Sequence, residues 1–503
     1  MHNKLAAAAI IITTLIITPF SSSASWSNET RLTTDSNSDW RPSVAYIKDG
    51  KTWVAWHSYR TGLADLFYKT TSNDGASWSP DTRLTFDPSN DVHPAIMQTR
   101  IGAIWVVWAS NRTGNFDLFY KTSSDNGVSW SAETQLTTDL GKDILSSTAQ
   151  TNDGHIWVVW MSTRSGNDDL FYKTSVDNGL TWTGDQQLTQ DSDDDRAPCV
   201  TQVQNGITWV VWSSNRQGNF EIYYKTSSDN GASWSGEARL TRDPDFDLFP
   251  SIAQARDGTI WVAWDSDRIS YRGDPQDDLL YSIYDGVTWS SDTQLTTNET
   301  DDFMASTAQG KTELWVVWVS DRTGNYEIFY KTVHITAHDV AVTSLLTSPT
   351  RAYIGQQVSV SVNVENHGDY MENITVSLYS KLTSDSLIGA QTATLANGTS
   401  TTLTFTWTPN MTGLYEIRAE AMIVSGEIDT DDNIYTRNQL LVTISGDINN
   451  DRAVNVHDLF TASRAYGSDE NSPNWNSDAD INNDGTVDTL DIEITSAHWG
   501  QSW

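Results

Sequence analysis

The stretch AIWVVWASNRTGNFDLFYKTSSDNGVSWSAETQLT, residues 103–137, holds the last three segments of one copy of a pattern that fills the first 330 residues of the chain. Each copy holds four short strand-like segments, separated by the Gly, Asn, Asp and Ser residues that turns favour. The spacing between copies is 52 residues four times and then 54. The Trp-Val-x-Trp element occurs once in each copy and begins at Trp53, Trp105, Trp157, Trp209, Trp261 and Trp315. The period predicts six units, each a small antiparallel sheet.

Strands are predicted in this copy over residues 93–100, 103–110, 116–123 and 129–137. Trp105 and Trp108 are three residues apart in one strand, so their side chains point to opposite faces of the sheet. Both faces must then be covered, as they are between neighbouring blades of a propeller. The sequence therefore predicts a mainly β chain whose residues 25–334 form a six-bladed β-propeller.

The two ends of the repeat region complement each other. The sixth unit ends near residue 336 without a fourth strand, while WSNETRLT, residues 26–33, is a fourth strand without its first three. We expect the N-terminal strand to complete the last blade and close the ring. Closure removes exposed sheet edges, which otherwise favour aggregation.

Composition limits the classes of function. The chain has 503 residues, enough for two to four domains, and a formal net charge of −34. This charge argues against nucleic acid and anionic membranes as partners and favours cation binding or a saline habitat. Cys199 is the only cysteine, so no internal disulfide is possible. Its strand-like surroundings favour a buried, inert thiol over a nucleophile.

The first 24 residues have the pattern of a secretory signal. One early Lys precedes an apolar run from Leu5 to Phe20, and small residues follow it. We expect cleavage near Ala24 and a secreted, extracellular or cell-surface protein. A retained membrane anchor is the alternative, although the run is short for a membrane span. No later segment is apolar enough to cross a bilayer.

One Asp and one Arg recur in every unit, before the first strand and after the second. These two loops open on the same face of a blade, so the sequence predicts six structural Asp–Arg pairs. The aspartates are Asp39, Asp91, Asp143, Asp195, Asp247 and Asp302, and the arginines are Arg60, Arg112, Arg164, Arg216, Arg268 and Arg322.

A catalytic site needs residues that break this symmetry, because one substrate is not sixfold. The breaks on this face are Arg41, His57, Tyr59, Asp194 to Arg196, Asp265 and a longer loop over residues 267–278. They include the carboxylates that glycoside chemistry uses. The sequence does not place a nucleophile beside its base, so it indicates no catalytic residue.

The turn between the third and fourth strands carries the pattern S-x-D-x-G-x-x-W. It occurs as SSDNGVSW (residues 123–130), SVDNGLTW (175–182) and SSDNGASW (227–234). Asp can accept backbone N–H groups within the turn, Gly can adopt a positive φ, and Trp packs the turn onto the core. The pattern resembles the Asp-box of BNR-repeat, sialidase-like propellers over residues 26–332. Unit one has Asn73 at the Asp position, unit five has Tyr284, and unit six has no box.

The resemblance implies a sialidase site, which the sequence matches only in part. The family uses three arginines on the substrate carboxylate, a Tyr nucleophile backed by Glu, and an Asp acid/base. Its first arginine usually lies in an R-I-P motif. Here Arg41 is followed directly by Pro42, one residue short of that motif.

Residues 336–444 alternate in QVSVSVNVEN and TTLTFTW, with turn residues between the runs. The pattern predicts an Ig-like β-sandwich of about seven strands. GQQVSVSVNVENHG and GLYEIRAEA resemble CARDB modules, which implies a spacer.

The tail, residues 446–503, contains two loops, DINNDRAVNVHD and DINNDGTVDTLD, with the oxygen-ligand spacing of an EF-hand-like calcium loop. Each loop is followed by one short helix, and the pair resembles a type I dockerin, although Asp replaces the usual Glu at position 12. The resemblance implies two Ca²⁺ ions and a cohesin-bearing partner; a solvated acidic tail is the alternative.

Arg452 stands where the second loop has Gly485, a departure expected to weaken or strain the first site. The expected ligands are Asp447, Asn449, Asp451, Ala453, Asn455, Asp458, Asp480, Asn482, Asp484, Thr486, Asp488 and Asp491, with Ala453 and Thr486 acting through their backbone carbonyls.

Two functions remain open from sequence. In the first, which the near-perfect repetition favours, the propeller is a structural module or binds a glycan or protein, and the dockerin tethers it to a cohesin partner. In the second, the propeller is a sialidase-like glycoside hydrolase in an extracellular polysaccharide-degrading complex.

Overall fold

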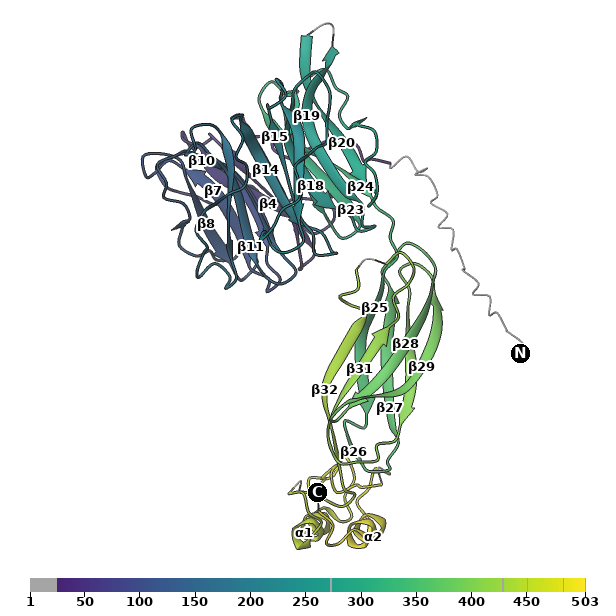
Figure 1. The fold of residues 1–503 in the computed structure, drawn as a ribbon. Coiled ribbons are helices and arrows are strands. Elements are labelled where there is room, and N and C mark those ends of the chain that lie inside the picture. Colours follow the sequence, from purple (N-terminus) through teal and green to yellow (C-terminus); the bar gives the residue numbers. More distant parts are fainter. Residues whose placement is uncertain (1–24, 272–273, 428, 450, 483, 503) are drawn as a thin grey trace, which may run out of the picture.

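The computed structural model describes residues 25–271, 274–427, 429–449, 451–482 and 484–502. A propeller, an elongated sandwich and a small two-helix unit follow one another along the chain (Figure 1). The predicted secretory signal over residues 1–24 lies outside the described residues. No described helix is long and apolar enough to cross a membrane.

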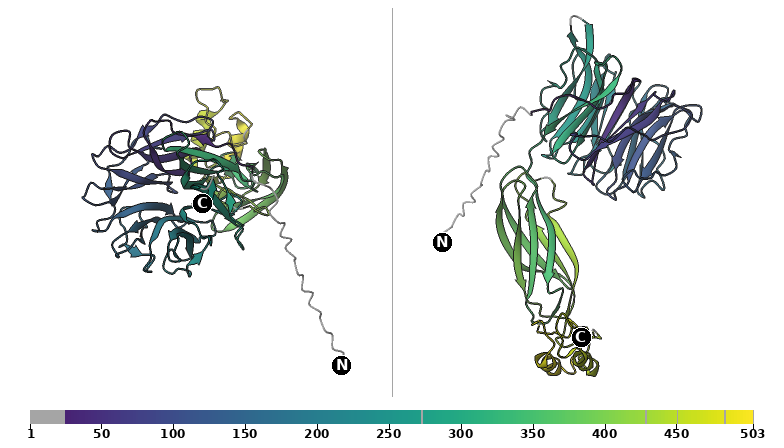
Figure 2. Two further views of the ribbon diagram at one scale, coloured as in Figure 1. Left: turned by 90° about the horizontal axis from the view of Figure 1, so that it is seen from above. Right: turned by 180° about the vertical axis from the view of Figure 1, so that it is seen from behind.

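Six four-stranded antiparallel sheets form the propeller, and the view from above shows them arranged around an axis (Figure 2, left). The innermost strands are β2 (Asp39–Ile47), β6 (Asp91–Gln98), β10 (Asp143–Gln150), β14 (Asp195–Gln202), β18 (Asp247–Gln254) and β22 (Asp302–Gln309). The second strands are β3 (Lys51–Ser58), β7 (Ile104–Ser110), β11 (Ile156–Ser162), β15 (Thr208–Ser214), β19 (Ile260–Tyr271) and β23 (Glu313–Ser320). The third strands are β4 (Asp65–Thr71), β8 (Asp117–Ser123), β12 (Asp169–Ser175), β16 (Glu221–Ser227), β20 (Asp274–Tyr284) and β24 (Glu327–His334).

The fourth strands are shorter than the sequence predicts, with two residues in each blade. They are β5 (Thr82–Arg83), β9 (Thr134–Gln135), β13 (Gln186–Gln187), β17 (Ala238–Arg239), β21 (Thr293–Gln294) and, for the last blade, β1 (Thr30–Arg31). At five of the six junctions a lysine of the following blade donates to the next carbonyl along the chain, as where Lys121 Nζ donates to the Leu84 oxygen at 3.0 Å. A side chain therefore bridges the blades where a longer strand was expected.

Closure of the ring is confirmed. Strand β1 pairs antiparallel with β24, with Thr30 opposite Tyr330, and completes the sheet of β22, β23 and β24. Glu327 is fully buried and is held by this strand, because Arg31 and Thr33 both donate to its carboxylate at 2.5 Å.

Tryptophans and glycines join neighbouring blades. Trp105 and Trp108 are 3% and 0% exposed, as expected for a strand covered on both faces. Gly127 of the Asp-box has φ +82°, and a Cβ there would overlap the Trp53 ring of the preceding blade. In unit one, Asn73 still accepts the Ser77 N–H at 2.9 Å, so its departure from Asp leaves the turn intact.

Residues 267–278, expected as a long loop, instead extend the hairpin of β19 and β20. Ile269 pairs with Gln276, and Tyr271 with Asp274. The extension projects from the end of the propeller that faces away from the sandwich (Figure 1). Gly, Pro and Asp in this segment favour turns, which is why the sequence indicated a loop.

The sandwich has eight strands where about seven were expected. One sheet consists of β25 (Val340–Ser348), β27 (Val358–Asn366) and β30 (Ser400–Trp407). The other consists of β26 (Arg351–Tyr353), β32 (Ile434–Thr443), β31 (Gly413–Ala421), β28 (Glu372–Lys381) and β29 (Asp385–Leu395). The predicted alternation in β27 is confirmed, since its Val358, Val360, Val362 and Val364 are all 0% exposed.

The tail forms helices α1 (Val456–Ala465) and α2 (Thr489–Ala497). Asn455 and Asp488 cap them, and each cap forms a reciprocal capping box with the Asp three residues later. Tyr353 of the sandwich packs into the small core of this unit, beside Ile448 and Ile481. The tail is therefore joined to the sandwich by a shared apolar contact.

Candidate functional site

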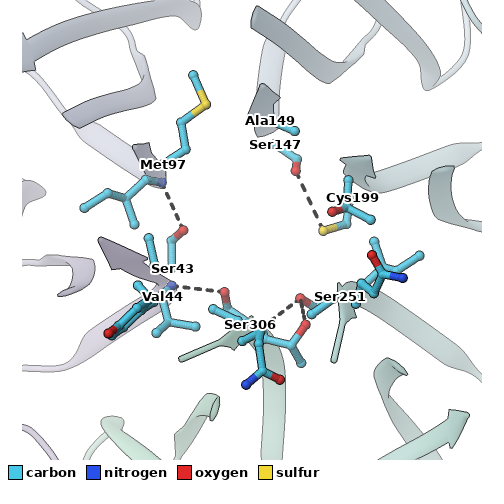
Figure 3. Close-up of a pocket in the computed structure, with 18 of the residues that line it drawn as sticks. Ser43, Val44, Met97, Ser147, Ala149, Cys199, Ser251 and Ser306 are labelled. Carbon is cyan, nitrogen blue, oxygen red and sulfur yellow. Dashed lines mark hydrogen bonds between the residues drawn. The ribbon is translucent and has the colours of Figure 1, made fainter. Parts of the chain in front are cut away.

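A central channel of about 760 Å³ runs along the axis of the propeller. Its wall is formed by the six innermost strands (Figure 3). Midway along it, Ser43 and Ser306 link adjacent blades by accepting backbone N–H groups at 3.1 Å. These hydroxyls hold the inner strands at a fixed separation.

Cys199 lies in this wall, at the repeat position that Ser147 occupies one blade earlier. It is half-buried rather than buried, because its side chain borders the channel. The Ser147 hydroxyl donates to its sulfur at 3.7 Å (Figure 3).

The six predicted Asp–Arg pairs are confirmed. Each aspartate is fully buried. The pairs are Arg60–Asp39 at 2.8 Å, Arg112–Asp91 at 2.9 Å, Arg164–Asp143 at 2.8 Å, Arg216–Asp195 at 3.0 Å, Arg268–Asp247 at 2.6 Å and Arg322–Asp302 at 2.8 Å.

Each of these arginines also binds a carboxylate that precedes the fourth strand of its blade. Arg60 binds Asp81 at 2.6 Å, and Arg322 binds Glu29 of the N-terminal segment. Arg60 also stacks over Phe67, with its guanidinium 4.5 Å from the ring centre. The donors of these arginines are thus engaged within the blade, which supports their structural role.

A second repeated feature shapes the mouth of the channel. Every innermost strand shifts register shortly after its buried Asp. The second residue after the Asp has a positive φ, between 49° and 59°, in all six blades. Such bulges redirect a side chain and are frequent beside functional sites. The six residues are Arg41, His93, Leu145, Ala197, Phe249 and Met304, and all of them line the channel.

Arg41 differs from the six repeated arginines. Its guanidinium lies 3.9 Å from the centre of the Phe249 ring, so it reaches from the first blade to the fifth. Its Nε is buried without a hydrogen-bond partner, and no ion pair joins Arg41 to any described residue. Burial lowers the pKa of Arg41 to about 10, although Asp265 favours its charged form.

The two imidazoles beside Arg41, those of His57 and His93, are neutral at pH 7. Burial, followed by the charge of Arg41, lowers the pKa of His57 to about 3. The same two causes hold the pKa of His93 well below its ordinary value. Burial and then the charge of Asp277 raise the pKa of Asp265 well above its ordinary range. Arg41 is therefore the cation of this cluster.

The structure brings some of the predicted symmetry breaks together and separates others. Arg41, His57 and Asp265 form one cluster, and the Tyr59 ring lies 5.9 Å from that of His57. Arg196 instead pairs with Asp168 and Asp194, at 2.5 and 2.8 Å. Asp195 belongs to the repeated pairs.

Sequence reasoning missed His93 and Phe249. His57 accepts the His93 backbone N–H at 3.5 Å, and their rings lie 5.5 Å apart. Both missed residues occupy the repeat position of Arg41, so comparing that position across the six units would have found them.

The tail supplies a second candidate site, made of oxygen donors. Carboxylate oxygens of Asp447, Asp451 and Asp458 lie within 4.8 Å of one another, at positions 1, 5 and 12 of the first loop. Carboxylates at these positions suit Ca²⁺. Arg452, at position 6, has φ +74°, where Gly485 of the second loop has φ +88°. The first loop therefore carries the backbone strain that its sequence suggested.

In the second loop, Asp480 accepts the backbone N–H groups of Asp484 and Gly485 at 3.1 and 2.9 Å. Asp491 completes the capping box of α2, as Asp458 completes that of α1. Among the described residues, the three-carboxylate grouping of the first loop has no counterpart in the second. Two occupied calcium sites therefore remain a prediction.

Comparison with known proteins agrees with this architecture. One relative is a sialidase from Clostridium perfringens, 24% identical over 278 residues, which cover 49% of this chain and 64% of the sialidase. Among solved structures, a Dyadobacter fermentans protein of unknown function matches with a TM-score of 0.51 and 15% identity, over 62% of this chain and 99% of that protein. A leech intramolecular trans-sialidase gives a TM-score of 0.46 and 12% identity, over 59% of this chain and 68% of that protein.

Family models match three consecutive regions. The BNR repeat-like domain covers residues 7–262, CARDB covers residues 337–436, and the dockerin type I domain covers residues 445–497. The first match spans half of the chain, and the structure continues its repeat to the sixth blade. The chain therefore belongs to the BNR repeat-like family, with a CARDB domain and a type I dockerin domain following its sialidase-like propeller.

Proposed function

We propose that this chain is a secreted component of an extracellular assembly, whose propeller binds an acidic glycan at the mouth of its channel. A dockerin implies cohesin-dependent assembly, and a sialidase-like domain suggests glycan-related activity. In this proposal the dockerin holds the protein on a cohesin-bearing partner, and the sandwich keeps the propeller away from the point of attachment.

The observation that carries the proposal is a channel-lining arginine that forms no ion pair within the described part of the chain. Arg41 lines the channel mouth and makes neither an ion pair nor a hydrogen bond with any described residue. A partly buried cation without a counter-ion is costly, so a bound anion would stabilise it. A guanidinium binds a carboxylate with two parallel hydrogen bonds, which makes this group a fitting ligand.

The surroundings of Arg41 favour a sugar as the carrier of that carboxylate. The Phe249 ring packs against the guanidinium, and Met304 also lines the channel. Aromatic rings commonly pack against the apolar faces of ligands while a few polar groups fix their orientation. The imidazole of His93 is neutral and lines the channel, and its Nδ1 has no hydrogen-bond partner among the described residues, so it suits a sugar hydroxyl.

A glycan array tests the binding. We expect the protein to bind glycans that carry sialic or uronic acids, to bind their neutral counterparts more weakly, and to lose this preference in Arg41→Gln. Arg100→Gln is the matched control, because Arg100 lies near Asp431 of the sandwich, away from the channel mouth. Equal binding of acidic and neutral glycans, or a preference unchanged in Arg41→Gln, would contradict the proposal.

The second candidate function is glycoside hydrolysis, and the raised pKa of the Asp265 carboxyl group favours it. A carboxyl group whose pKa lies well above its ordinary range can act as a general acid near neutral pH. Asp277, whose pKa burial and then Asp301 raise to about 6, is an electrostatic neighbour of Asp265. Analysis of bound glycans for released sugar distinguishes the two functions: a hydrolase releases sugar and loses this activity in Asp265→Asn, whereas a binding module releases none.

A further inference from the structure

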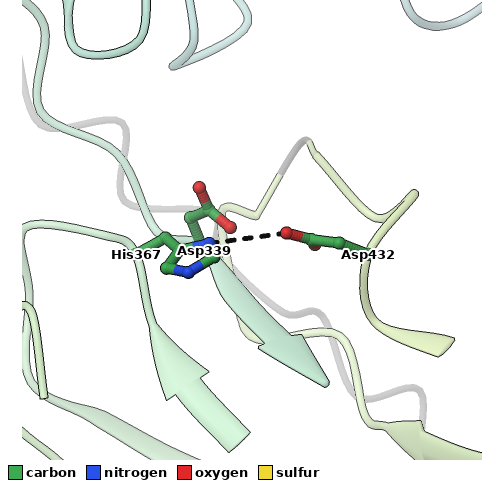
Figure 4. Close-up of side chains that lie close together, drawn as sticks. All are labelled: Asp339, His367 and Asp432. Carbon is green, nitrogen blue, oxygen red and sulfur yellow. Dashed lines mark ion pairs between the residues drawn. The ribbon is translucent and has the colours of Figure 1, made fainter. Parts of the chain in front are cut away.

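The end of the sandwich that faces the propeller gathers three metal-binding side chains from separate segments. Asp339 precedes β25, His367 follows β27, and Asp432 lies just before β32. One ligand atom from each lies within 4.8 Å of the other two. Figure 4 shows the three side chains converging at this end. We propose that Asp339, His367 and Asp432 bind a divalent transition-metal ion such as Zn²⁺ at the joint between the propeller and the sandwich.

Unsatisfied oxygen atoms at this position support a ligand. Oδ1 of Asp339 and Oδ1 of Asp432 are both buried and have no hydrogen-bond partner among the described residues. Buried polar atoms are nearly always paired, so a group of unpaired ones calls for an ion or water.

A simple His–Asp ion pair does not account for the cluster. His367 Nδ1 lies 3.5 Å from Asp432 Oδ2, beyond the 2.7–2.9 Å that is typical of a charge-assisted hydrogen bond. Arg256 of the propeller approaches Asp339 Oδ2, also at 3.5 Å. That contact leaves Asp339 Oδ1 open to a ligand.

The charges at the joint also call for a cation. The carboxylates of Asp339, Asp432 and Asp429 act on one another here, and Glu365 lies 3.6 Å from His367 Nε2. The cations that face this group are the Arg256 guanidinium and, when protonated, the His367 imidazole. Carboxylates thus outnumber cations, and a divalent ion would balance the excess.

The donor set selects the class of ion. Ca²⁺ and Mg²⁺ take oxygen ligands, whereas an imidazole with two carboxylates suits Zn²⁺ and its first-row neighbours. Donor atoms around a tetrahedral zinc ion are roughly 3.4 Å apart at bond lengths of about 2.1 Å. Small side-chain movements from the present separation would reach this geometry, and the His367 side chain, 34% exposed, leaves a path for the ion.

The proposed ion would fasten the sandwich next to the propeller. Arg256 also contacts Asp369 at 3.5 Å and the His367 carbonyl at 3.3 Å, so the propeller already contacts the segment that carries His367. Tying residues 339, 367 and 432 together would stiffen the surface on which Arg256 rests. The distance between the propeller and the dockerin would then depend less on bending at the joint.

Zinc titration of the full chain tests the proposal. The protein is stripped of metal, returned to millimolar Ca²⁺ to occupy the dockerin, and titrated with Zn²⁺ in a calorimeter. We expect one zinc ion per chain, bound at least tenfold more weakly by His367→Gln and by Asp432→Asn. Both side chains are more than 30% exposed, so both variants should fold, as circular dichroism would verify.

His155→Gln is the matched control, because His155 lies 3.8 Å from a single carboxylate, that of Asp153, and belongs to no three-ligand group. It should bind zinc as the wild type does. Thermal melting with and without Zn²⁺ gives a second measurement, in which zinc should stabilise the wild type but not His367→Gln. Absence of zinc binding, or binding that both cluster variants retain, would overturn the proposal.

Discussion

Arg41 and Arg60 carry the same group on the same face of the propeller, and the structure gives them opposite roles. Arg60 binds two carboxylates and stacks on Phe67, all within its own blade. Arg41 reaches across the ring to Phe249 and forms no ion pair or hydrogen bond with a described residue. The six repeated arginines stabilise the blades, so the site depends on the residue that departs from the repeat.

Gly127 is expected to be indispensable to the Asp-box turn. Gly127→Ala places a side chain at φ +82° and drives a methyl group into the Trp53 ring of the neighbouring blade. Backbone strain of about 1 kcal/mol and overpacking of about 1–3 kcal/mol should together lower the free energy of unfolding. Chemical denaturation measures the loss.

Gly102→Ala separates these two costs. Gly102 has a similar φ of +88°, but no atom lies within 4 Å of its added Cβ. This variant should therefore show the backbone strain alone. Equal losses in both variants would show that contact between the blades adds nothing at Gly127.

The raised pKa of Asp265 predicts that the difference in stability between Asp265→Asn and the wild type depends on pH. Its pKa in the folded protein lies well above the 3.8 of an unperturbed Asp, so the unfolded chain releases this proton first. The stability that Asp265 contributes is therefore complete below about pH 4 and is lost as the pH rises. Asn does not titrate and can still accept the Met304 N–H that Asp265 accepts at 3.2 Å.

The melting temperature of Asp265→Asn, relative to that of the wild type, should consequently rise between pH 5 and pH 8. Differential scanning calorimetry at several pH values measures this. Asp369→Asn serves as the comparison, since its carboxylate lies outside the channel-mouth cluster and instead binds His334 at 3.0 Å. A difference between Asp265→Asn and wild type that is constant with pH would contradict the assigned protonation.

At the scale of the elements, the sequence repeat allowed the blades to be predicted, but it did not predict the residues that form the channel mouth. The Trp pairs, the Asp–Arg pairs and the N-terminal closing strand all follow from positions that recur at a fixed period. The channel mouth depends on a bulge, and strand patterns do not reveal the register shift that turns Arg41 and His93 inward. Contact between Arg41 and Phe249 could not be predicted either, because a strand pattern indicates neighbouring strands and not residues across a ring.

The N-terminal strand should determine the stability of the propeller. A protein that begins at residue 34 loses Trp26, which packs edge-on against Trp261 at 5.9 Å, and the Glu29 partner of Arg322. It also loses Arg31 and Thr33, leaving the buried Glu327 without two of its hydrogen-bond donors. Leaving a buried acceptor without its donors costs about 1–3 kcal/mol, and more when the acceptor is charged.

We expect this truncated protein to melt at a much lower temperature than one that begins at residue 25, and to aggregate through the exposed edge of β24. Calorimetry and light scattering measure the two effects. Adding a synthetic peptide of residues 25–33 should recover part of the stability. A truncated protein that melts with unchanged cooperativity would show that β1 does not close the ring.

At the scale of the whole molecule, the channel mouth and the dockerin lie at opposite ends of the chain of domains, with the sandwich between them (Figure 1). Arg351 links the sandwich to the tail by donating to the Asp447 carbonyl at 2.7 Å and pairing with Asp478 at 3.3 Å. Attachment through the dockerin would therefore leave the glycan site free. The two ends should respond independently to treatments that affect only one of them.

Removal of calcium is the treatment that separates them. The tail has a small apolar core and closely spaced carboxylates, among them Asp447, Asp451 and Asp458, which repel one another without a cation. Metal binding should therefore be coupled to folding of residues 446–502. Chelation of Ca²⁺ in the full chain should abolish cohesin binding and raise hydrogen exchange in this segment, while exchange in the propeller stays unchanged.

Asp484→Ala should weaken cohesin binding more than Asp451→Ala, because Arg452, at φ +74°, already strains the first loop. A tail equally protected with and without calcium, or a propeller that loosens along with it, would contradict this division between the two ends.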